Sequence, residues 1–199
     1  MIEAYRRGDD LHMLTARQLV GKDEVTKADR QLAKAVNFGL LYGMGARGFR
    51  IYARSKYGVE LTEAQAQQYR AAFFAAYPAL AAWHRKIGRT EKRPIETRTL
   101  AGRRVLNVTG FNEKLNTPVQ GTGADGLKQA LGLLWERRGQ CPGAVPVLVV
   151  HDEIVVECDA AQADAVAAWL KQAMLDGMAS LVAPVPVEVE VQIAPTWGG

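Results

Sequence analysis

Two neighbouring carboxylates and an imidazole interrupt an apolar stretch in the last third of the sequence. The stretch LVVHDEIVVEC, Leu148 to Cys158, places His151, Asp152 and Glu153 between two β-branched runs and predicts a buried hairpin. A hairpin tip needs only turn-forming residues, and Gly or Asn would suit it better than these three. Taken alone, the three residues are best interpreted as a polar turn, but their types raise the question of whether they carry chemistry.

A second group of residues has helical spacing. In ADRQLAKAVNFGLLYG, Arg30, Lys34 and Phe38 follow one another at intervals of four and therefore share one face of a helix. One interpretation is a solvated charged face with a single exposed ring, which is common on helices. The other is a site in which the two cations bind a polyphosphate and the ring stacks on a sugar or base. Spacing alone gives the two interpretations about equal weight.

Basic residues gather in one part of the chain. The formal net charge is +4 and the pI is near 9.1, which by itself does not identify a nucleic-acid partner. The segment from residue 85 to residue 104, however, contains eight cations and only two carboxylates. The cations are Arg85, Lys86, Arg89, Lys92, Arg93, Arg98, Arg103 and Arg104. This local field suits binding to phosphates.

The elements that must position these residues follow from capping and periodicity. Thr26 with Asp29, and Thr62 with Gln65, are capping boxes at the starts of two helices. The sequence predicts helical segments over residues 10–20, 26–42, up to 57, 62–77, 79–88, 112–138 and 160–181. It predicts strands on both sides of Ala101-Gly102, in the hairpin around Asp152, and in the alternating VPVEVEVQIA of residues 185–194. A helical first half followed by a small antiparallel sheet with packed helices is the α+β class.

Composition excludes several classes of protein. The 199 residues are 48% hydrophobic, as expected of a globular chain. Cys141 and Cys158 form neither a disulfide framework nor a zinc motif, so a reducing, cytoplasmic setting is expected. No apolar run approaches the length of a membrane span, and we expect no membrane partner.

Three motifs together resemble those of family A DNA polymerases, the DNA polymerase I type. The first is R-x-x-x-K-x-x-N-F-G-x-x-Y-G, beginning at Arg30, which resembles the fingers helix of that family. The others are NTPVQGTGADGLKQA from Asn116, similar to its long template-primer helix, and VHDEIVVE, similar to its palm motif. The resemblance covers most of the chain in the family's order. It implies a helical fingers region over residues 1–95 and part of a palm over residues 96–199.

The resemblance implies template-directed DNA synthesis, in which a dNTP transfers its nucleotidyl group to a primer 3′-hydroxyl. Asp152 would bind the catalytic Mg²⁺ ions, with Glu153 as a further candidate ligand. Arg30 and Lys34 would contact the triphosphate, and Lys34 is a candidate proton donor to pyrophosphate. Phe38 would stack on the sugar and base of the dNTP. Tyr42 would lie near the templating base.

The same resemblance implies contacts with primer-template DNA. His151 would lie beside the primer terminus, and Asn116 and Gln120 would read the minor groove, although an Asn and a Gln on a helix can serve solubility alone. Arg103 and Arg104, in a hairpin similar to a basic hairpin of the family, are candidate phosphate contacts.

The match departs from the family at two places. The family often has an Arg four residues before the position of Asn116; in this sequence it is Asn112, and Lys114 is a substitute in charge. The resemblance also implies a first catalytic Asp, its strand and a thumb, all upstream of these motifs. Three hypotheses stay open: a polymerase part that works with a separate polypeptide, a non-catalytic DNA-binding remnant, or a protein whose family residues have lost their role. The intact motifs favour the first.

Overall fold

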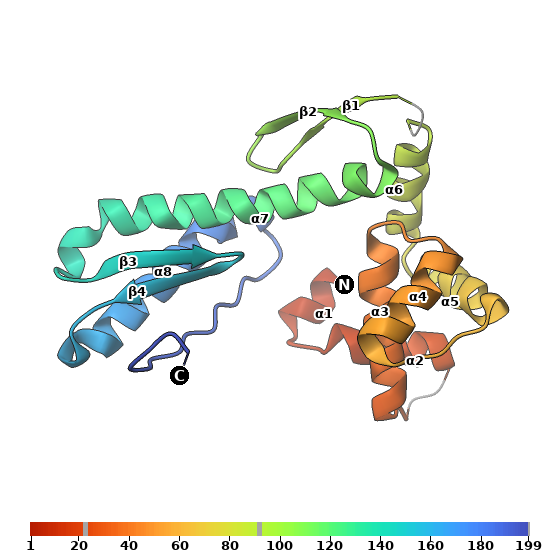
Figure 1. Ribbon diagram of the computed structural model, residues 1–199, viewed down its shortest axis with the longest axis horizontal. Coiled ribbons are helices and arrows are strands. Elements are labelled where there is room, and N and C mark those ends of the chain that lie inside the picture. Colours follow the sequence, from red (N-terminus) through yellow and green to blue (C-terminus); the bar gives the residue numbers. More distant parts are fainter. Residues whose placement is uncertain (22–23, 91–92, 199) are drawn as a thin grey trace. The chain divides into compact units, whose positions relative to one another are not determined.

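The computed structural model describes residues 1–21, 24–90 and 93–198, which divide into two compact units (Figure 1). Unit 1 comprises Met1–Thr97 and Arg104–Pro118, and unit 2 comprises Arg98–Arg103 and Val119–Gly199. Each unit has its own hydrophobic core. The division into fingers and palm near residue 95 stays a prediction.

Unit 1 is mainly helical. Its helices are α1 (Ile2–Arg6), α2 (Leu11–Val20), α3 (Lys27–Leu41), α4 (Ala46–Tyr57), α5 (Glu63–Ala76), α6 (Pro78–Gly88) and the first residues of α7 (Phe111–Glu136). The strands β1 (Ile95–Arg98) and β2 (Arg104–Val108) pair in a hairpin. Each helix predicted in this region is present.

Local sequence explains where the helices of unit 1 begin and end. Thr26 caps α3 and Thr62 caps α5, and in both cases the predicted reciprocal capping box is formed. Gly21 and Gly58 end α2 and α4 in the left-handed conformation that glycine adopts most easily. These signals act between residues at most four apart, which is why the sequence predicts them.

The core of unit 1 lies between α3, α4 and α5. Leu32, Val36 and Leu40 supply one face of α3, which packs on Phe49 of α4 and Phe73 of α5. The stripe of Arg30, Lys34 and Phe38 is therefore left on another face of the same helix.

Unit 2 contains the remaining elements: most of α7, the short 3-10 helix η1 (Arg138–Gln140), the strands β3 (Val145–Val150) and β4 (Glu153–Glu157), the 3-10 helix η2 (Ala160–Gln162), and α8 (Ala163–Val182). Its core joins Ala130 and Leu134 of α7 to Ile154 of β4 and Trp169 of α8. The helix predicted over residues 160–181 thus begins as a 3-10 turn.

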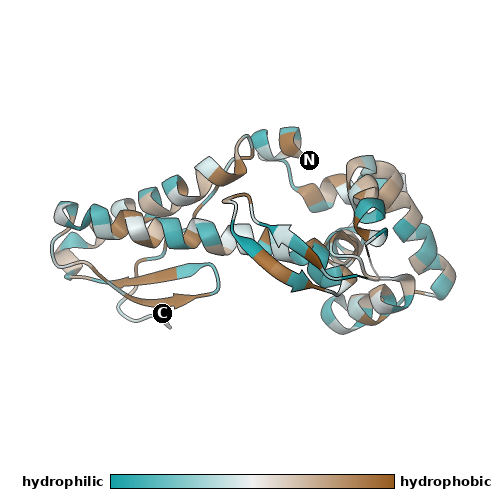
Figure 2. Cartoon of the chain, turned by 90° about the horizontal axis from the view of Figure 1, so that it is seen from above, coloured by the Kyte–Doolittle hydropathy of each residue, from teal (hydrophilic) through white to brown (hydrophobic). Residues whose placement is uncertain are grey.

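The predicted hairpin around Asp152 is present, but only one of its strands contributes to the core. Strands β3 and β4 are antiparallel, and Val150 pairs with Glu153 next to the turn. Both strands are hydrophobic in the hairpin nearest the C label of Figure 2, yet β3 is largely exposed, with Val145 at 54%. The expectation of a buried hairpin is corrected because the core of unit 2 takes its strand residues from β4 alone.

The strand predicted over residues 185–194 is not formed. These residues are irregular, and Val191 and Ile193 are exposed. An alternating pattern becomes a strand only when a neighbour accepts its backbone hydrogen bonds. In the described parts of the chain, β3 and β4 pair with each other and with no third strand.

The α+β class is confirmed, since the described elements are mostly helical with two small antiparallel hairpins. Among the described residues, no helix has both the length and the apolar character of a membrane span.

Candidate nucleotide and metal sites

The candidate nucleotide face in unit 1 is the outer stripe of α3. Arg30 and Lys34 are half-buried, whereas the ring of Phe38 is 48% exposed. A large aromatic side chain exposed beside two cations makes little use of its hydrophobic surface in the fold of unit 1. The stripe can therefore offer two phosphate donors and one stacking surface to a ligand.

The two glycines of the motif let other elements approach the end of this helix. A Cβ atom on Gly39 would lie 3.0 Å from the Phe49 ring, so glycine allows α4 to pack closely on α3. Gly43 has a φ of +88°, and a Cβ there would meet the ring of Phe111 at 2.6 Å. Glycine at both positions thus allows α4 and the start of α7 to pack closely around the end of α3, where Tyr42 lies.

Tyr42 is joined to the start of α7 through its main chain. Asn112, at the position where the family often has Arg, donates from Nδ2 to the carbonyl oxygen of Tyr42 at 2.8 Å. This oxygen belongs to the C-cap residue of α3, where carbonyl groups lack helical partners. Asn112 therefore ties the C-terminal end of the candidate site to α7.

Two residues that sequence reasoning missed lie on the same face as the stripe. Asp10 binds Arg30, with Oδ2 accepting from Nε at 2.7 Å and from Nη2 at 2.6 Å. The ring of His12 lies 5.4 Å from that of Phe38, measured between centroids. Asp10 could have been recognised as an N-cap before an apolar run, but nothing in the spacing pairs either residue with α3.

The protonation of His12 follows from its neighbours. Burial lowers the pKa of His12; Asp10 acts in the opposite sense, and Arg30 and Lys34 lower the pKa further, so that it lies below the usual value. Nδ2 of Asn37 and Nδ1 of His12 are hydrogen-bonded at 3.0 Å, and a neutral imidazole carries one N–H donor. The neutral ring is thus a donor on a face that already holds two cations.

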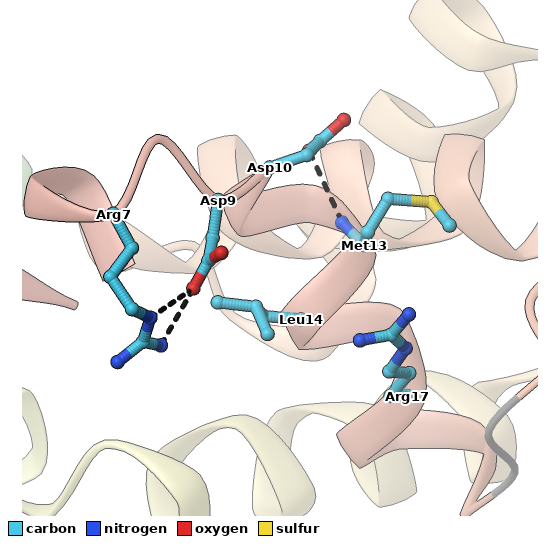
Figure 3. Close-up of a pocket in the computed structure, with 6 residues that line it drawn as sticks. All are labelled: Arg7, Asp9, Asp10, Met13, Leu14 and Arg17. Atoms are coloured by element: carbon cyan, nitrogen blue, oxygen red, sulfur yellow. Dashed lines mark hydrogen bonds and ion pairs between the residues drawn. The ribbon is translucent and has the colours of Figure 1, made fainter. Parts of the chain in front are cut away.

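A depression of about 370 Å³ lies beside Asp10 and is lined from α2 and the residues that precede it (Figure 3). Figure 3 shows the Arg7–Asp9 pair, with Nη2 and Oδ2 2.6 Å apart, and the bond from the Met13 amide to Asp10. Both carboxylates of this depression therefore already accept hydrogen bonds from protein donors.

The candidate metal site in unit 2 is the turn between β3 and β4. His151 has a φ of +55°, the left-handed conformation, and both His151 and Asp152 are exposed. Glu153 begins β4, and its Oε1 accepts a 2.9 Å hydrogen bond from Nε1 of Trp197. The two strands hold the backbone of the turn, so the Asp152 carboxylate is exposed on a fixed support.

The carboxylates of Asp152 and Glu153 are of the chemical type that binds a hard divalent cation. Carboxylate oxygens suit Mg²⁺, which is usually bound through one or two carboxylates with water and phosphate completing its shell. Glu153 is already engaged by Trp197, so Asp152 is the stronger candidate ligand. The described residues contain no group of three or more His, Cys, Asp or Glu side chains that could hold a metal ion.

Arg103 and Arg104, the candidate phosphate contacts of the basic segment, are both exposed, but each is bound to a carboxylate of the protein. Arg104 donates from Nε to Glu96 at 2.8 Å in unit 1. In unit 2, Arg103 donates from Nε to Asp125 at 2.6 Å and from Nη2 to the carbonyl oxygen of Gly121. Each guanidinium has five N–H donors, so both keep donors for a phosphate. Lys92 lies outside the described residues.

The residues predicted on α7 differ in exposure. Gln120 is exposed, while Asn116 is half-buried and its Oδ1 has no partner in the part of the chain that the structure describes. Lys114 is fully buried, and its ammonium donates to the carbonyl oxygens of Thr90 and Arg93. The interpretation of Lys114 as a substitute in charge is corrected, because an ammonium group used inside the fold cannot reach a phosphate.

The structure brings Arg30, Lys34, Phe38 and Tyr42 to one helix of unit 1 and its C-cap. It places His151, Asp152 and Glu153 at one turn of unit 2. The sequence of the whole chain, residues 1–199, matches the model of DNA polymerase family A, and the chain belongs to that family. Family A polymerases are DNA-directed DNA polymerases that use Mg²⁺.

Individual relatives agree with this assignment. The chain is 43% identical to DNA polymerase I of Aquifex aeolicus over 203 residues, and 35% identical to the thermostable DNA polymerase I of Thermus aquaticus over 210 residues. Each match covers 99% of the chain but only 35% and 24% of the relative. The chain thus spans about a third or less of the length of these relatives.

A solved structure shares the fold. The POL domain of Pol1 from M. smegmatis, in complex with DNA primer-template and dNTP, matches with a TM-score of 0.72 and 24% identity. The match covers 88% of the chain and 32% of that structure.

Proposed function

We propose that this chain forms the nucleotide-binding helix and one metal-binding turn of a template-directed DNA polymerase. The reaction is nucleotidyl transfer from a dNTP to a primer 3′-hydroxyl. The observation that carries the proposal is the face of α3, where Arg30, Lys34 and the exposed Phe38 ring lie together in a chain of family A. The solved structure with the same fold is a complex with primer-template DNA and dNTP.

Each residue of the face has a role that fits its surroundings. Arg30 and Lys34 bind the triphosphate, and Lys34 passes a proton to the leaving pyrophosphate. Phe38 stacks on the sugar and base, and Tyr42 lies near the templating base. His12, whose pKa is lowered, adds a neutral imidazole donor beside them.

The turn of unit 2 supplies the metal-binding part. Asp152 would hold Mg²⁺, which when bound stabilises the attacking and leaving oxygens of the transfer. His151 lies beside the primer terminus, Arg103 and Arg104 bind phosphates of the DNA, and Asn116 and Gln120 contact its minor groove.

The exposed apolar surface of strand β3 is an argument that another segment packs on unit 2. A strand with an unpaired edge and exposed valines is stable when another strand covers it. The relatives are about three times as long as the matched segment or longer, so their remaining residues can provide such a strand. We infer that a further segment, in the same or a separate polypeptide, supplies it together with a second catalytic carboxylate and a thumb.

Primer extension tests this proposal. The 199-residue chain alone should show essentially no extension, whereas addition of a polypeptide carrying the preceding part of a relative's polymerase domain should restore Mg²⁺-dependent synthesis. Asp152→Asn in the restored pair should abolish synthesis without loss of DNA binding. Extension by the chain alone would show that a second carboxylate ligand is present within it.

The second candidate function is a non-catalytic DNA-binding remnant. One observation favours it: the carboxylate of Glu153 is engaged by Trp197. A restored pair that folds and binds primed DNA, but does not extend it although Asp152 is intact, would establish the remnant instead.

A further inference from the structure

Asp10 uses its two carboxylate oxygens for two different purposes. Oδ1 accepts from the backbone amides of His12 at 2.8 Å and Met13 at 3.2 Å, which caps α2. Figure 3 shows the bond from Met13. Oδ2 accepts from Nε and Nη2 of Arg30, on α3. A single side chain therefore joins the start of α2 to the stripe on α3.

The bond to Asp10 determines which edge of Arg30 is free. A guanidinium is planar, and its donors form two edges that can each bind an anion. Asp10 occupies the edge formed by Nε and Nη2. Among the described residues no acceptor binds Nη1, so the edge formed by Nη1 and Nη2 remains available for a phosphate.

Tethering also reduces the entropy that Arg30 loses on binding. A long cationic side chain that is free in solvent must be immobilised when it grips a ligand, which weakens binding. Asp10 is itself fixed by two backbone amides, so it is a rigid support. The bond to Asp10 therefore restrains the Arg30 side chain before any ligand arrives.

The same carboxylate aligns His12 with the stripe. The cap defines the first turn of α2, where His12 lies, and His12 contacts Phe38 and is hydrogen-bonded to Asn37. Donors from α2 and α3 are thereby held on one face by a residue that carries a negative charge.

We propose that Asp10 is a positioning residue of the nucleotide site, which presents the free edge of Arg30 to the triphosphate. This inference rests on the proposed function of the α3 face. The contrary role would be a gate, in which Asp10 competes with the triphosphate for Arg30 and must release it. Positioning is favoured because Asp10 is anchored by the α2 backbone and leaves one edge of Arg30 open.

The two roles predict opposite changes in triphosphate affinity when the Asp10 carboxylate is removed. Simple electrostatics and the gate both predict tighter binding of an anion when a nearby negative charge is removed. Positioning predicts weaker binding. Asp10→Ser is the informative variant, because serine keeps the N-cap acceptor but is too short to hold Arg30.

The experiment titrates the 199-residue chain with dATP and with inorganic triphosphate, which lacks the base and sugar. We expect Asp10→Ser to weaken binding of both by about 5- to 30-fold. Asp9→Ser is the matched control, since Asp9 precedes the same helix and pairs with Arg7, and it should change the affinity less than about 2-fold. If Asp10→Ser lowers helicity in circular dichroism, Asp10→Asn keeps both cap and side-chain size and should also weaken binding.

A double-mutant cycle then tests whether Asp10 acts through Arg30. In an Arg30→Ala background, Asp10→Ser should change the affinity less than about 2-fold, because the side chain that it positions is gone. An equal loss in both backgrounds, or tighter binding by Asp10→Ser, would overturn the inference. If the unaltered chain binds triphosphate and Lys34→Ala weakens that binding, the proposed function stands whatever Asp10 does. Absence of binding by the unaltered chain would contradict the proposed function and this inference together.

Discussion

The ammonium group of Lys114 and the carbonyl oxygen of Arg93 are joined by a 2.7 Å hydrogen bond inside unit 1. Nζ also donates to the carbonyl oxygen of Thr90 at 2.6 Å, and the side chain is fully buried. A buried ammonium is tolerated only when its donors are satisfied, and backbone carbonyls satisfy them at this position. Lys114 thus fastens the first turns of α7 to the loop that follows α6.

Replacement of Lys114 should destabilise the chain. Lys114→Met keeps the length of the side chain but leaves the Thr90 and Arg93 carbonyls without this donor, at a cost of about 1–3 kcal/mol for each buried group left unpaired. Thermal denaturation followed by circular dichroism measures the effect. Lys171→Met, at an exposed position of α8, should leave the melting temperature nearly unchanged. Equal melting temperatures for both variants would contradict the buried role.

Two glycines of unit 2 should respond to alanine in opposite ways. A Cβ on Gly177 would lie 2.6 Å from the backbone nitrogen of Ala130, so α7 and α8 must separate, which typically costs about 1–3 kcal/mol. A Cβ on Gly132 of α7 would meet nothing within 4 Å, and alanine there should stabilise the helix by about 0.5–1 kcal/mol. Urea denaturation of Gly177→Ala and Gly132→Ala checks both signs.

The pair formed by Asp125 and Arg103 should make stability depend on acid. Burial acts to raise the pKa of Asp125, but hydrogen bonds from Thr99 and Arg103 outweigh it and hold the pKa below the usual 3.8. The stabilisation is therefore complete above pH 3.8 and is lost as the pH falls through the lower pKa of the folded state. The melting temperature of Asp125→Asn should fall less steeply with acidification than that of the unaltered chain. Glu136→Gln, which removes an exposed carboxylate, serves as the control. If the melting temperature of Asp125→Asn falls with pH as steeply as that of the unaltered chain, Asp125 does not contribute to the acid dependence of stability.

The basic segment should bind primed duplex DNA with strong salt dependence. Neutralising Arg103 and Arg104 together should reduce the slope of log affinity against log salt by about 1 to 2, because each phosphate contact releases about 0.9 counterion. Arg54→Gln, an exposed arginine of α4 outside the segment, should leave the slope unchanged. An identical slope for the double variant would place the DNA path elsewhere.

Phe38 should influence the choice of sugar. The resemblance to family A implies that phenylalanine at this position disfavours dideoxynucleotides and that tyrosine accepts them, and the exposed ring is available for such contact. In the restored polymerase, Phe38→Tyr should raise the ratio of dideoxy to deoxy incorporation in a primer-extension assay. An unchanged ratio would mean that another residue faces the sugar.

Several features were predictable because they depend on residues close together in the chain. The capping boxes at Thr26 and Thr62 and the stripe on α3 involve neighbours three or four residues apart, and all of them are present. The turn that exposes Asp152 was predictable for the same reason, since polar residues between two β-branched runs form a hairpin tip.

The features that only the tertiary structure decided depend on which surfaces meet. Asp10 and Arg30 are 20 residues apart, and Lys114 binds carbonyl oxygens 21 and 24 residues away. No local sequence pattern predicts either contact. The exposure of β3 and the irregular course of residues 185–194 have the same origin. An apolar run is buried, and an alternating run becomes a strand, only when another element covers it, and that depends on the packing of the chain rather than on its local sequence.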